Sequence, residues 1–141
     1  MSHSKEKVKK LPISEFLHSL QLAPRLVVEL VVLNPKHQVL LKKRKYEPYI
    51  GYWHIPGGFL LKNETIDKCI GRLLEEEIDN EGKIDSRDFV FVQLTEDPAS
   101  DFRGHLLHYI VLYKGNTFVS NTENLRFFSE CHTTQYPTMQ R

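Results

Sequence analysis

An acidic cluster follows an arginine near the middle of the sequence, in the stretch GRLLEEEID. If this stretch is helical, Arg72 and Glu76 lie four residues apart on one face, and Glu77 lies four residues from Leu73. Two carboxylates on one surface repel each other unless a cation lies between them, and oxygen ligands suit Mg²⁺ or Mn²⁺. Such a cation would also bind phosphate groups. The cluster is therefore a candidate site for a divalent metal and a phosphorylated ligand.

The alternative interpretation is a solvated acidic helix end without chemistry. Composition alone favours this interpretation, because glutamate is a common residue on exposed helix surfaces. The position of the cluster argues against it, because negative side chains at the C-terminal end of a helix oppose the helix dipole. Composition leaves both interpretations open.

The spacing around the cluster distinguishes the two interpretations. It resembles the Nudix box, G-x5-E-x7-R-E-U-x-E-E-x-G-U, in which U is apolar. The sequence departs from the box at Leu73, where the family has glutamate, and at Asp79 and Asn80, where it has glycine and an apolar residue. The stretches LLKKR and GYWHIPGG also resemble the usual approach to the box, so the resemblance covers residues 25–114. The matching box positions are Gly58, Glu64, Arg72, Leu74, Glu76 and Glu77.

The resemblance implies a hydrolase of a nucleoside diphosphate linked to another group, with Mg²⁺ or Mn²⁺ as cofactor. By position, Glu76 and Glu77 would bind the metal together with the backbone carbonyl of Gly57. Glu64 is counted with the metal-binding residues and would orient the cluster. Arg72 would hold the carboxylates through charge-assisted hydrogen bonds. The metal would neutralise phosphate charge or activate water.

Leu73 leaves three hypotheses open, because a leucine can neither bind metal nor act as a base. In the first, the chain resembles GDP-mannose mannosyl hydrolases, a Nudix branch with the same arginine-leucine pair that cleaves nucleotide sugars at the sugar carbon. In the second, it is an ordinary Nudix pyrophosphohydrolase whose base lies elsewhere. In the third, it is an inactive domain that binds a nucleotide or another protein.

The base that activates water must then lie outside the box helix. The candidates are His105, His108, Glu96, Asp97, Asp101 and Glu123. His108 is selected because histidine has a suitable pKa, and Glu123 because other Nudix enzymes bring a carboxylate from that loop. His105 and His108 lie three apart on an expected strand, so at most one faces the site. The histidine of the GDP-mannose branch has its place near Thr122, which cannot serve as a base. The predicted catalytic residues are Arg72, Glu76, Glu77, His108 and Glu123.

Four further residues are predicted to bind substrate. Arg44 ends LLKKR, where the GDP-mannose branch has an arginine that binds diphosphate. Tyr46 and Tyr49 lie in a loop with Pro48 and Gly51, which leaves their rings available to stack on a base. Tyr109 follows His108 in a pair that resembles one in the same branch.

The pattern along the chain predicts an α+β protein, and the resemblance specifies a Nudix fold with a mixed sheet sandwiched between α-helices. The first two strands are expected to form a hairpin, with burial on both faces because both are almost wholly apolar. Asn63 is expected to cap the central helix. The expected helices are 12–20 and 64–78, and the expected strands are 25–33, 38–44, 87–94, 105–114 and 124–129.

Composition indicates one soluble domain. The chain has 141 residues, a net charge of +1 and only two cysteines, so neither a nucleic-acid partner nor a disulfide framework is expected. Residues 1–10 are expected to be a flexible tail and residues 11–141 a single Nudix domain. No stretch is apolar for long enough to predict a membrane span. These features favour a cytoplasmic location, and the resemblance allows a homodimer.

Overall fold

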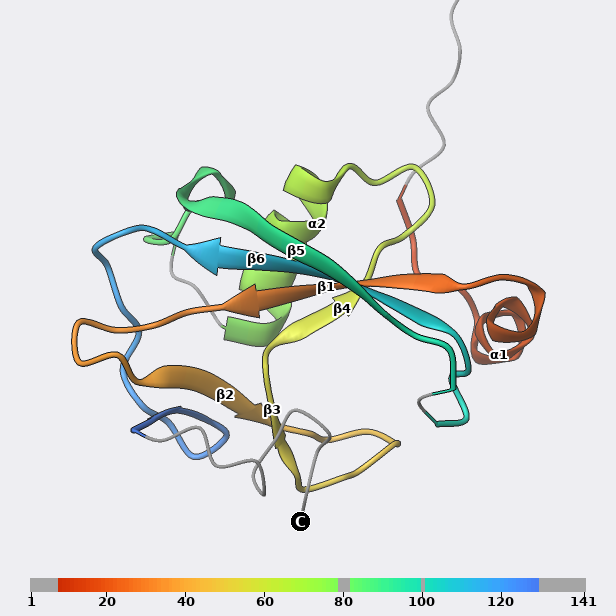
Figure 1. The fold of residues 1–141 in the computed structure, drawn as a ribbon, viewed down its shortest axis with the longest axis horizontal. Helices are drawn as coiled ribbons and strands as arrows, with labels where there is room; N and C mark the ends of the chain where they lie inside the picture. Colours follow the sequence, from red (N-terminus) through yellow and green to blue (C-terminus); the bar gives the residue numbers. More distant parts are fainter. Residues whose placement is uncertain (1–7, 79–81, 100, 130–141) are drawn as a thin grey trace, which may run out of the picture.

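The computed structural model describes residues 8–78, 82–99 and 101–129. Its elements form two β-sheets accompanied by helices (Figure 1). The box positions Asp79 and Asn80 lie outside the described residues. In chain order the elements are α1 (Ile13–Leu22), β1 (Arg25–Val31), β2 (Val39–Lys43), β3 (Trp53–His54), β4 (Gly57–Phe59), α2 (Ile66–Leu73), the π-helical turn η1 (Leu74–Ile78), the 3₁₀ turn η2 (Ser86–Asp88), β5 (Phe89–Asp97), β6 (Leu106–Tyr113) and β7 (Leu125–Phe128).

The larger sheet is mixed, as predicted. Its strand order is β4-β1-β6-β5, with β1 and β6 parallel and the other pairs antiparallel. The register places Val27 beside His108 and Glu29 beside Gly57. The smaller sheet, in the order β3-β2-β7, is antiparallel. The larger sheet therefore joins the glycine pair before the box to the strand that carries His108.

The predicted hairpin of the first two strands is wrong. β1 belongs to the larger sheet and β2 to the smaller one, and only a single bridge, between Leu33 after the end of β1 and Val39 of β2, pairs the chain across the turn. Leu40 and Leu41 of β2 both have 0% exposure. Because neighbouring strand residues point to opposite faces, β2 is covered on both sides, as its apolar sequence predicted.

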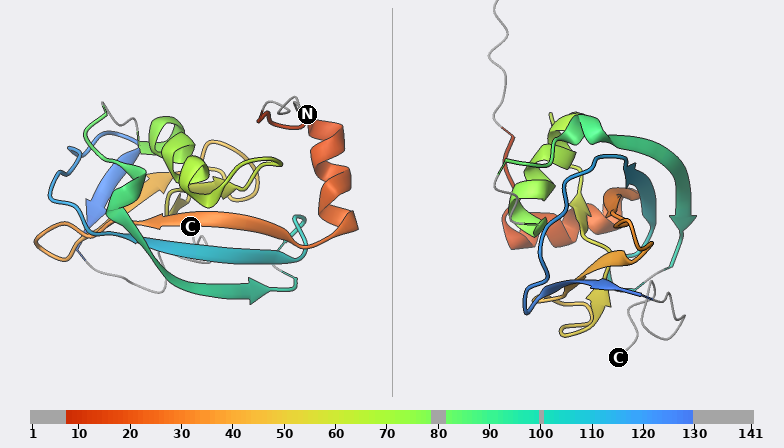
Figure 2. Two further views of the ribbon diagram at one scale, coloured as in Figure 1. Left: turned by 90° about the horizontal axis from the view of Figure 1, so that it is seen from above. Right: turned by 90° about the vertical axis from the view of Figure 1, so that its left-hand side faces the viewer.

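The position of α2 depends on packing. Cys69, Ile70 and Leu73 of this helix are buried in one core cluster with Val28 and Leu30 of β1. A helix of this length is only marginally stable in water by itself. Its contact with the larger sheet therefore stabilises it, and it lies against one face of that sheet (Figure 2).

The predicted N-terminal helix is confirmed as α1, which lies at one end of the larger sheet (Figure 2). Only Leu20 of this helix is buried, and Ile13 is 72% exposed. Phe16 packs edge-to-face against Phe59 of β4, with ring centroids 5.1 Å apart. None of the helices formed by the described residues is long and apolar enough to cross a membrane.

Candidate active site

The helix of the predicted box begins at Ile66, two residues later than expected. Thr65, and not Asn63, is the N-cap: its hydroxyl accepts a hydrogen bond from the amide of Lys68 over 3.1 Å. Asn63 has a φ of 70°, a left-handed conformation that asparagine tolerates in turns. Glu64 therefore precedes the helix, and its side chain accepts a hydrogen bond from the amide of Leu61.

Arg72 organises the polar side of the box, as predicted. Its Nε and Nη2 donate to the two carboxylate oxygens of Glu64 over 2.7 and 3.0 Å. Its Nη1 donates to Glu76 over 3.1 Å, and Nη2 also donates to the carbonyl of Phe59 over 2.8 Å. The planar guanidinium matches a carboxylate with two parallel bonds, which a lysine cannot do. One side chain thus connects the end of β4, the turn before α2 and the acidic cluster.

These bonds fix the charge of Glu64. Burial would raise the pKa of Glu64, but hydrogen bonds from Arg72 and from the amide of Leu61 lower it below its ordinary value overall. The neighbouring thiol of Cys69 has its pKa raised to about 12, first by burial and then by Glu64. Because Arg72 binds both oxygens of Glu64, the structure favours the orienting role of Glu64, and its role as a metal ligand stays a prediction.

Leu73 faces the core and not the acidic cluster. It is 1% exposed, and a Cβ atom added to Gly58 would lie 2.7 Å from its Cδ2 atom. The leucine thus fills the space directly beneath the glycine pair. The chain then widens into the π-helical turn η1, a rare conformation that is often found at functional sites. The sequence had predicted Leu73 in the same neighbourhood as Glu76 and Glu77, whereas the structure separates it from them.

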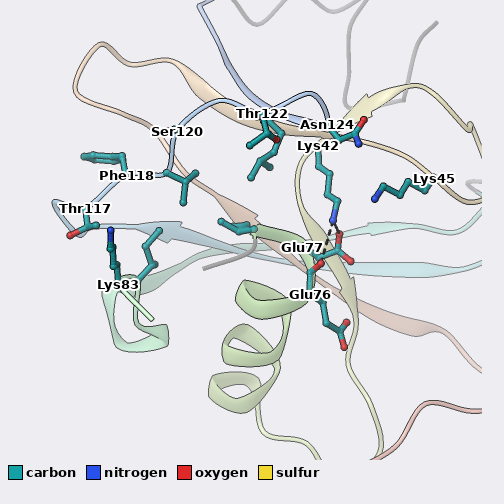
Figure 3. Close-up of a pocket in the computed structure, with 14 residues that line it drawn as sticks. Lys42, Lys45, Glu76, Glu77, Lys83, Thr117, Phe118, Ser120, Thr122 and Asn124 are labelled. Carbon is teal, nitrogen blue, oxygen red and sulfur yellow. Dashed lines mark hydrogen bonds and ion pairs between the residues drawn. The ribbon is translucent and has the colours of Figure 1, made fainter. Parts of the chain in front are cut away.

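Both carboxylates of the acidic pair have cations of this chain as partners. The ammonium of Lys42 lies 2.8 Å from Glu77 and donates to the carbonyl of Glu76 over 3.4 Å (Figure 3). Lys10 lies 3.1 Å from the carboxylate of Glu76, which Arg72 also contacts. The Lys42 side chain is only 16% exposed. Its ammonium therefore occupies a position beside Glu77 that suits a cation.

A cavity of about 480 Å³, here the first cavity, lies beside this cluster. Gly57, Glu76 and Glu77 all line it, so three of the predicted metal-binding positions come together. The remaining wall combines aromatic rings with basic groups. The residues concerned are Phe16, Lys42, Arg44, Tyr46, His54, Phe59, Phe102, Arg103 and His108.

His108 lines the first cavity together with Glu29, a residue that the sequence analysis missed. Glu29 lies 2.6 Å from Nδ1 of His108. This hydrogen bond raises the pKa of His108, although burial opposes the shift. The available signal was a single charged residue inside the apolar run RLVVELVVL. His105 lies outside the cavity, with its Nε2 3.8 Å from Glu96.

Two guanidinium groups face the same cavity. Arg44 was predicted, and Arg103 was not. Arg103 pairs with Asp101 over 2.7 Å, and both side chains are 11% exposed. Burial and the nearby Arg103 lower the pKa of Arg44. Burial together with Arg44 and Lys42 also lowers the pKa of His54, to about 3, so that histidine is neutral. Positive groups gathered in this way suit an anionic ligand.

Of the three tyrosines predicted to bind substrate, only Tyr46 lines the first cavity. Tyr49 instead stacks on Tyr52, with ring centroids 5.5 Å apart. The prediction for Tyr109 is corrected: its ring packs against Phe91 and the core. It follows His108 on one strand, so it points to the other face.

Glu123, a predicted catalytic residue, lies outside both cavities of the site. It is exposed in the loop before β7 and lines neither the first cavity nor the second, which is described below. Its catalytic role stays a prediction.

The donor set fits a weakly liganded magnesium ion. Within the described residues, no three histidine, cysteine or acidic side chains gather around one point. Mg²⁺ usually keeps several waters and binds through one or two carboxylates and substrate phosphates. Glu76, Glu77 and the carbonyl of Gly57 meet this requirement. Lys42 would have to leave Glu77 for the metal to bind.

The comparisons with known proteins agree with this geometry. The NUDIX domain family model matches residues 23–136, so the chain belongs to the Nudix hydrolase family, as the box residues indicated. An ADP-ribose pyrophosphatase of Methanocaldococcus jannaschii is 29% identical over 110 residues, 78% of this chain and 61% of that protein. The low-salt glycan biosynthesis protein Agl8 of Haloferax volcanii is 35% identical over 80 residues, 55% of this chain and 49% of that protein. The chain thus spans 61% and 49% of the length of these two relatives.

Solved structures support the same fold. A MutT/nudix family protein from Enterococcus faecalis superposes with a TM-score of 0.61 at 23% identity, covering 88% of this chain and 54% of that chain. The NUDIX domain of Shewanella oneidensis NrtR, which was solved with ADP ribose, gives a TM-score of 0.60 at 19% identity, with 84% and 83% covered. The α+β Nudix fold is therefore confirmed.

The first prediction concerns Leu73. Replacing it with glutamate, the usual box residue, places a carboxylate in a nearly closed apolar space. We expect Leu73→Glu to lower the free energy of unfolding by about 3 to 5 kcal/mol, as for an uncompensated buried charge. Leu73→Met, the control, is expected to lower it by only about 1 kcal/mol. Urea unfolding measures both, and a Leu73→Glu variant as stable as the wild type would contradict the core position of Leu73.

The second prediction concerns the pair of Glu29 and His108. Because the pKa of His108 is raised in the folded state, the pair stabilises the fold fully below the unfolded value of about 6.5. This contribution is lost as the pH rises through the folded pKa. We expect Glu29→Gln to remove it, so that the stability difference from the wild type is largest below about pH 6.5 and shrinks as the pH rises through the raised pKa of His108. Glu96→Gln, beside the partly buried His105, is the control. A pH-independent difference for Glu29→Gln would refute the pair.

Proposed function

We propose that the chain hydrolyses a nucleoside diphosphate joined to a sugar, with Mg²⁺ or Mn²⁺ as cofactor. The observation that carries this proposal is the composition of the first cavity. There the acidic pair Glu76 and Glu77 shares one space with two guanidinium groups and several aromatic rings. The M. jannaschii relative is named for ADP-ribose, itself a nucleoside diphosphate joined to a sugar, which supports this substrate class.

Each part of the cavity suits one part of such a substrate. Arg44 and Arg103 would bind the diphosphate, because guanidinium groups match phosphate oxygens with paired hydrogen bonds. The exposed ring of Tyr46 and the ring of Phe59 would contact the base. Glu76 and Glu77 would hold the metal, which when bound neutralises phosphate charge and lowers the pKa of a coordinated water. Lys42, released from Glu77, would be free to contact a phosphate oxygen.

His108 is the base that the geometry favours. Glu29 binds its Nδ1 atom, so Nε2 is the ring nitrogen left to take a proton from the attacking water. The carboxylate orients the ring and stabilises the imidazolium that forms, as in other base-carboxylate pairs. Because its pKa is raised, His108 accepts this proton only once the pH is high enough to deprotonate it. His108 would thus supply the base that the box itself lacks, because Leu73 stands where the family has a glutamate.

The finer substrate assignment is a nucleotide sugar such as GDP-mannose or ADP-ribose. The Arg72-Leu73 pair resembles the GDP-mannose branch, in which water attacks the sugar carbon. The M. jannaschii relative is named a pyrophosphatase, which corresponds to attack at phosphorus. The two substrates are therefore tested side by side, and the bond cleaved is measured directly.

A homodimer in the cytoplasm completes the proposal. Exposed apolar side chains of α1, including Ile13 and Leu22, and of the edge strand β5, including Phe91 and Leu94, offer surface for a second copy. Cys69 is a free thiol, which suits a reducing compartment.

The proposed function predicts metal-dependent turnover that requires Glu77. With Mg²⁺, we expect release of product from ADP-ribose or GDP-mannose, and a fall of about 100-fold or more in kcat for Glu77→Gln. Glu75→Gln is the matched control, because Glu75 is exposed in the same π-helical turn and does not line the first cavity.

Water labelled with oxygen-18 then identifies the bond that is cleaved. Label in the sugar shows attack at carbon, and label in a phosphate shows attack at phosphorus. Absence of turnover on a panel of nucleotide sugars, or equal rates for Glu77→Gln and the wild type, would overturn the proposed function.

A further inference from the structure

A second cavity of about 480 Å³ adjoins the acidic pair (Figure 3). It lies between the segment 117–124, which precedes β7, and the π-helical turn η1. Lys42, Lys45, Glu76 and Glu77 line both cavities. The ion pair of Lys42 and Glu77 therefore lies at the junction of the two cavities.

The linings of the two cavities differ in chemistry. The first contains several aromatic rings and two guanidinium groups. The second is lined along segment 117–124 by hydroxyl and amide groups, one ring and Val119, and elsewhere by Lys83 and the apolar residues Ile78, Ile84 and Leu125. Hydroxyl and amide groups both donate and accept hydrogen bonds, and they therefore match the hydroxyls of a sugar. The groups in question are Thr117, Ser120, Thr122 and Asn124, with the ring of Phe118 among them.

The wall that carries these groups is held in place by other interactions. The hydroxyl of Tyr113 donates to the carbonyl of Thr117 over 2.7 Å and accepts from its amide over 3.0 Å. The amide of Thr122 donates to the carbonyl of Leu125 over 2.7 Å. Phe118 packs against the ring of Tyr113, with centroids 5.6 Å apart. The side chain of Asn121, which does not line the cavity, also accepts a hydrogen bond from the amide of Phe127 over 2.9 Å. Because these interactions fix the segment, the polar side chains that do line the cavity are not needed to hold it in place.

Two of these side chains are available for a ligand. Within the part of the chain that the structure describes, the amide group of the Asn124 side chain has no hydrogen-bond partner, and the hydroxyl of Thr122 makes only a long bond of 3.5 Å to Leu125. Both residues lie across the cavity from Glu76 and Glu77, near the backbone end of the Lys42 side chain (Figure 3). A group bound there would be adjacent to a phosphate held at the acidic pair.

We propose that the second cavity binds the sugar that is attached beyond the diphosphate, while the first cavity binds the nucleoside. This inference rests on the proposed function and adds the orientation of the substrate. The diphosphate lies at the junction, beside Lys42, Glu76 and Glu77, and Thr122 and Asn124 hydrogen-bond sugar hydroxyls. The substrate thus spans both cavities.

Paired ligands that differ only in the distal sugar test this orientation. ADP-ribose is compared with ADP, and GDP-mannose with GDP, by calorimetric titration in EDTA, which prevents metal-dependent turnover, and again with Mg²⁺ for the two diphosphates. We expect the wild type to bind the sugar-bearing member of at least one pair more tightly. Thr122→Val and Asn124→Ala should each weaken its binding about 3- to 10-fold, the effect of one hydrogen bond. Binding of ADP or GDP should change by less than about twofold, because no lost bond concerns the nucleoside or the diphosphate.

Two control variants complete the experiment. Asn116→Ala, directly before segment 117–124 and outside the cavity lining, should bind every ligand as the wild type does. Tyr46→Ala, in the first cavity, should weaken the binding of the nucleoside diphosphate and of its sugar derivative by the same factor. The melting temperature of each variant shows that it is folded, and Thr122→Val changes the shape of the side chain least.

The outcomes separate this inference from the proposed function. If the wild type binds ADP-ribose or GDP-mannose no better than the diphosphate, or if Asn124→Ala and Thr122→Val leave sugar binding unchanged, the orientation is wrong while the proposed function stands. Equal weakening of ADP and ADP-ribose by these variants would also overturn it. If no nucleotide binds under either condition, both proposals fail.

Discussion

The guanidinium group of Arg72 is the interaction on which the rest of the site depends. It binds both oxygens of Glu64, one oxygen of Glu76 and the carbonyl of Phe59. These bonds hold the end of β4, the turn before α2 and the π-helical turn η1 in fixed positions relative to one another. Such paired, charge-assisted bonds are among the strongest that side chains make, and a lysine cannot reproduce them. Arg72 thus fixes the turn that carries Glu64 relative to the helix end that carries Glu76 and Glu77, and these two carboxylates face the first cavity.

Leu73 changes the charge balance of this network. With leucine in place of the box glutamate, the described cluster contains three carboxylates, and Arg72, Lys10 and Lys42 neutralise them. Glu64 is committed to Arg72, so only Glu76 and Glu77 can exchange a side-chain cation for a metal ion. A metal ion bound there would compete with Lys42, and in the proposed mechanism the base comes from outside the box helix. The strand pair β1 and β6 brings together the histidine and the carboxylate, His108 and Glu29, that we propose for this role.

Features that depend on residues close together in the sequence were predicted correctly. Features that depend on which strands pair in the sheets were missed. The spacing from Gly58 to Glu77 predicted the family and the bracing role of Arg72, because a helix and the turn before it are local. The order of helices and strands along the chain predicted the α+β fold. The hairpin of β1 and β2 was wrong because β2 pairs instead with β3, the next strand, and with β7, which lies near the end of the described residues. Glu29 was missed because the parallel pairing of β1 with β6 brings it to His108, 79 residues away. Tyr109 was misplaced because strand alternation, and not resemblance, decides which way it points.

Binding of Mn²⁺ tests most directly whether the acidic pair is a metal site that Lys42 occupies in the absence of metal. Mn²⁺ takes the same oxygen ligands as Mg²⁺, and its free concentration can be followed by electron paramagnetic resonance. The structure predicts one bound ion per chain, weaker binding for Glu77→Gln by about tenfold or more, and tighter binding for Lys42→Met, because the competing ammonium is gone. No bound ion in the wild type, or affinities that neither substitution changes, would contradict the account.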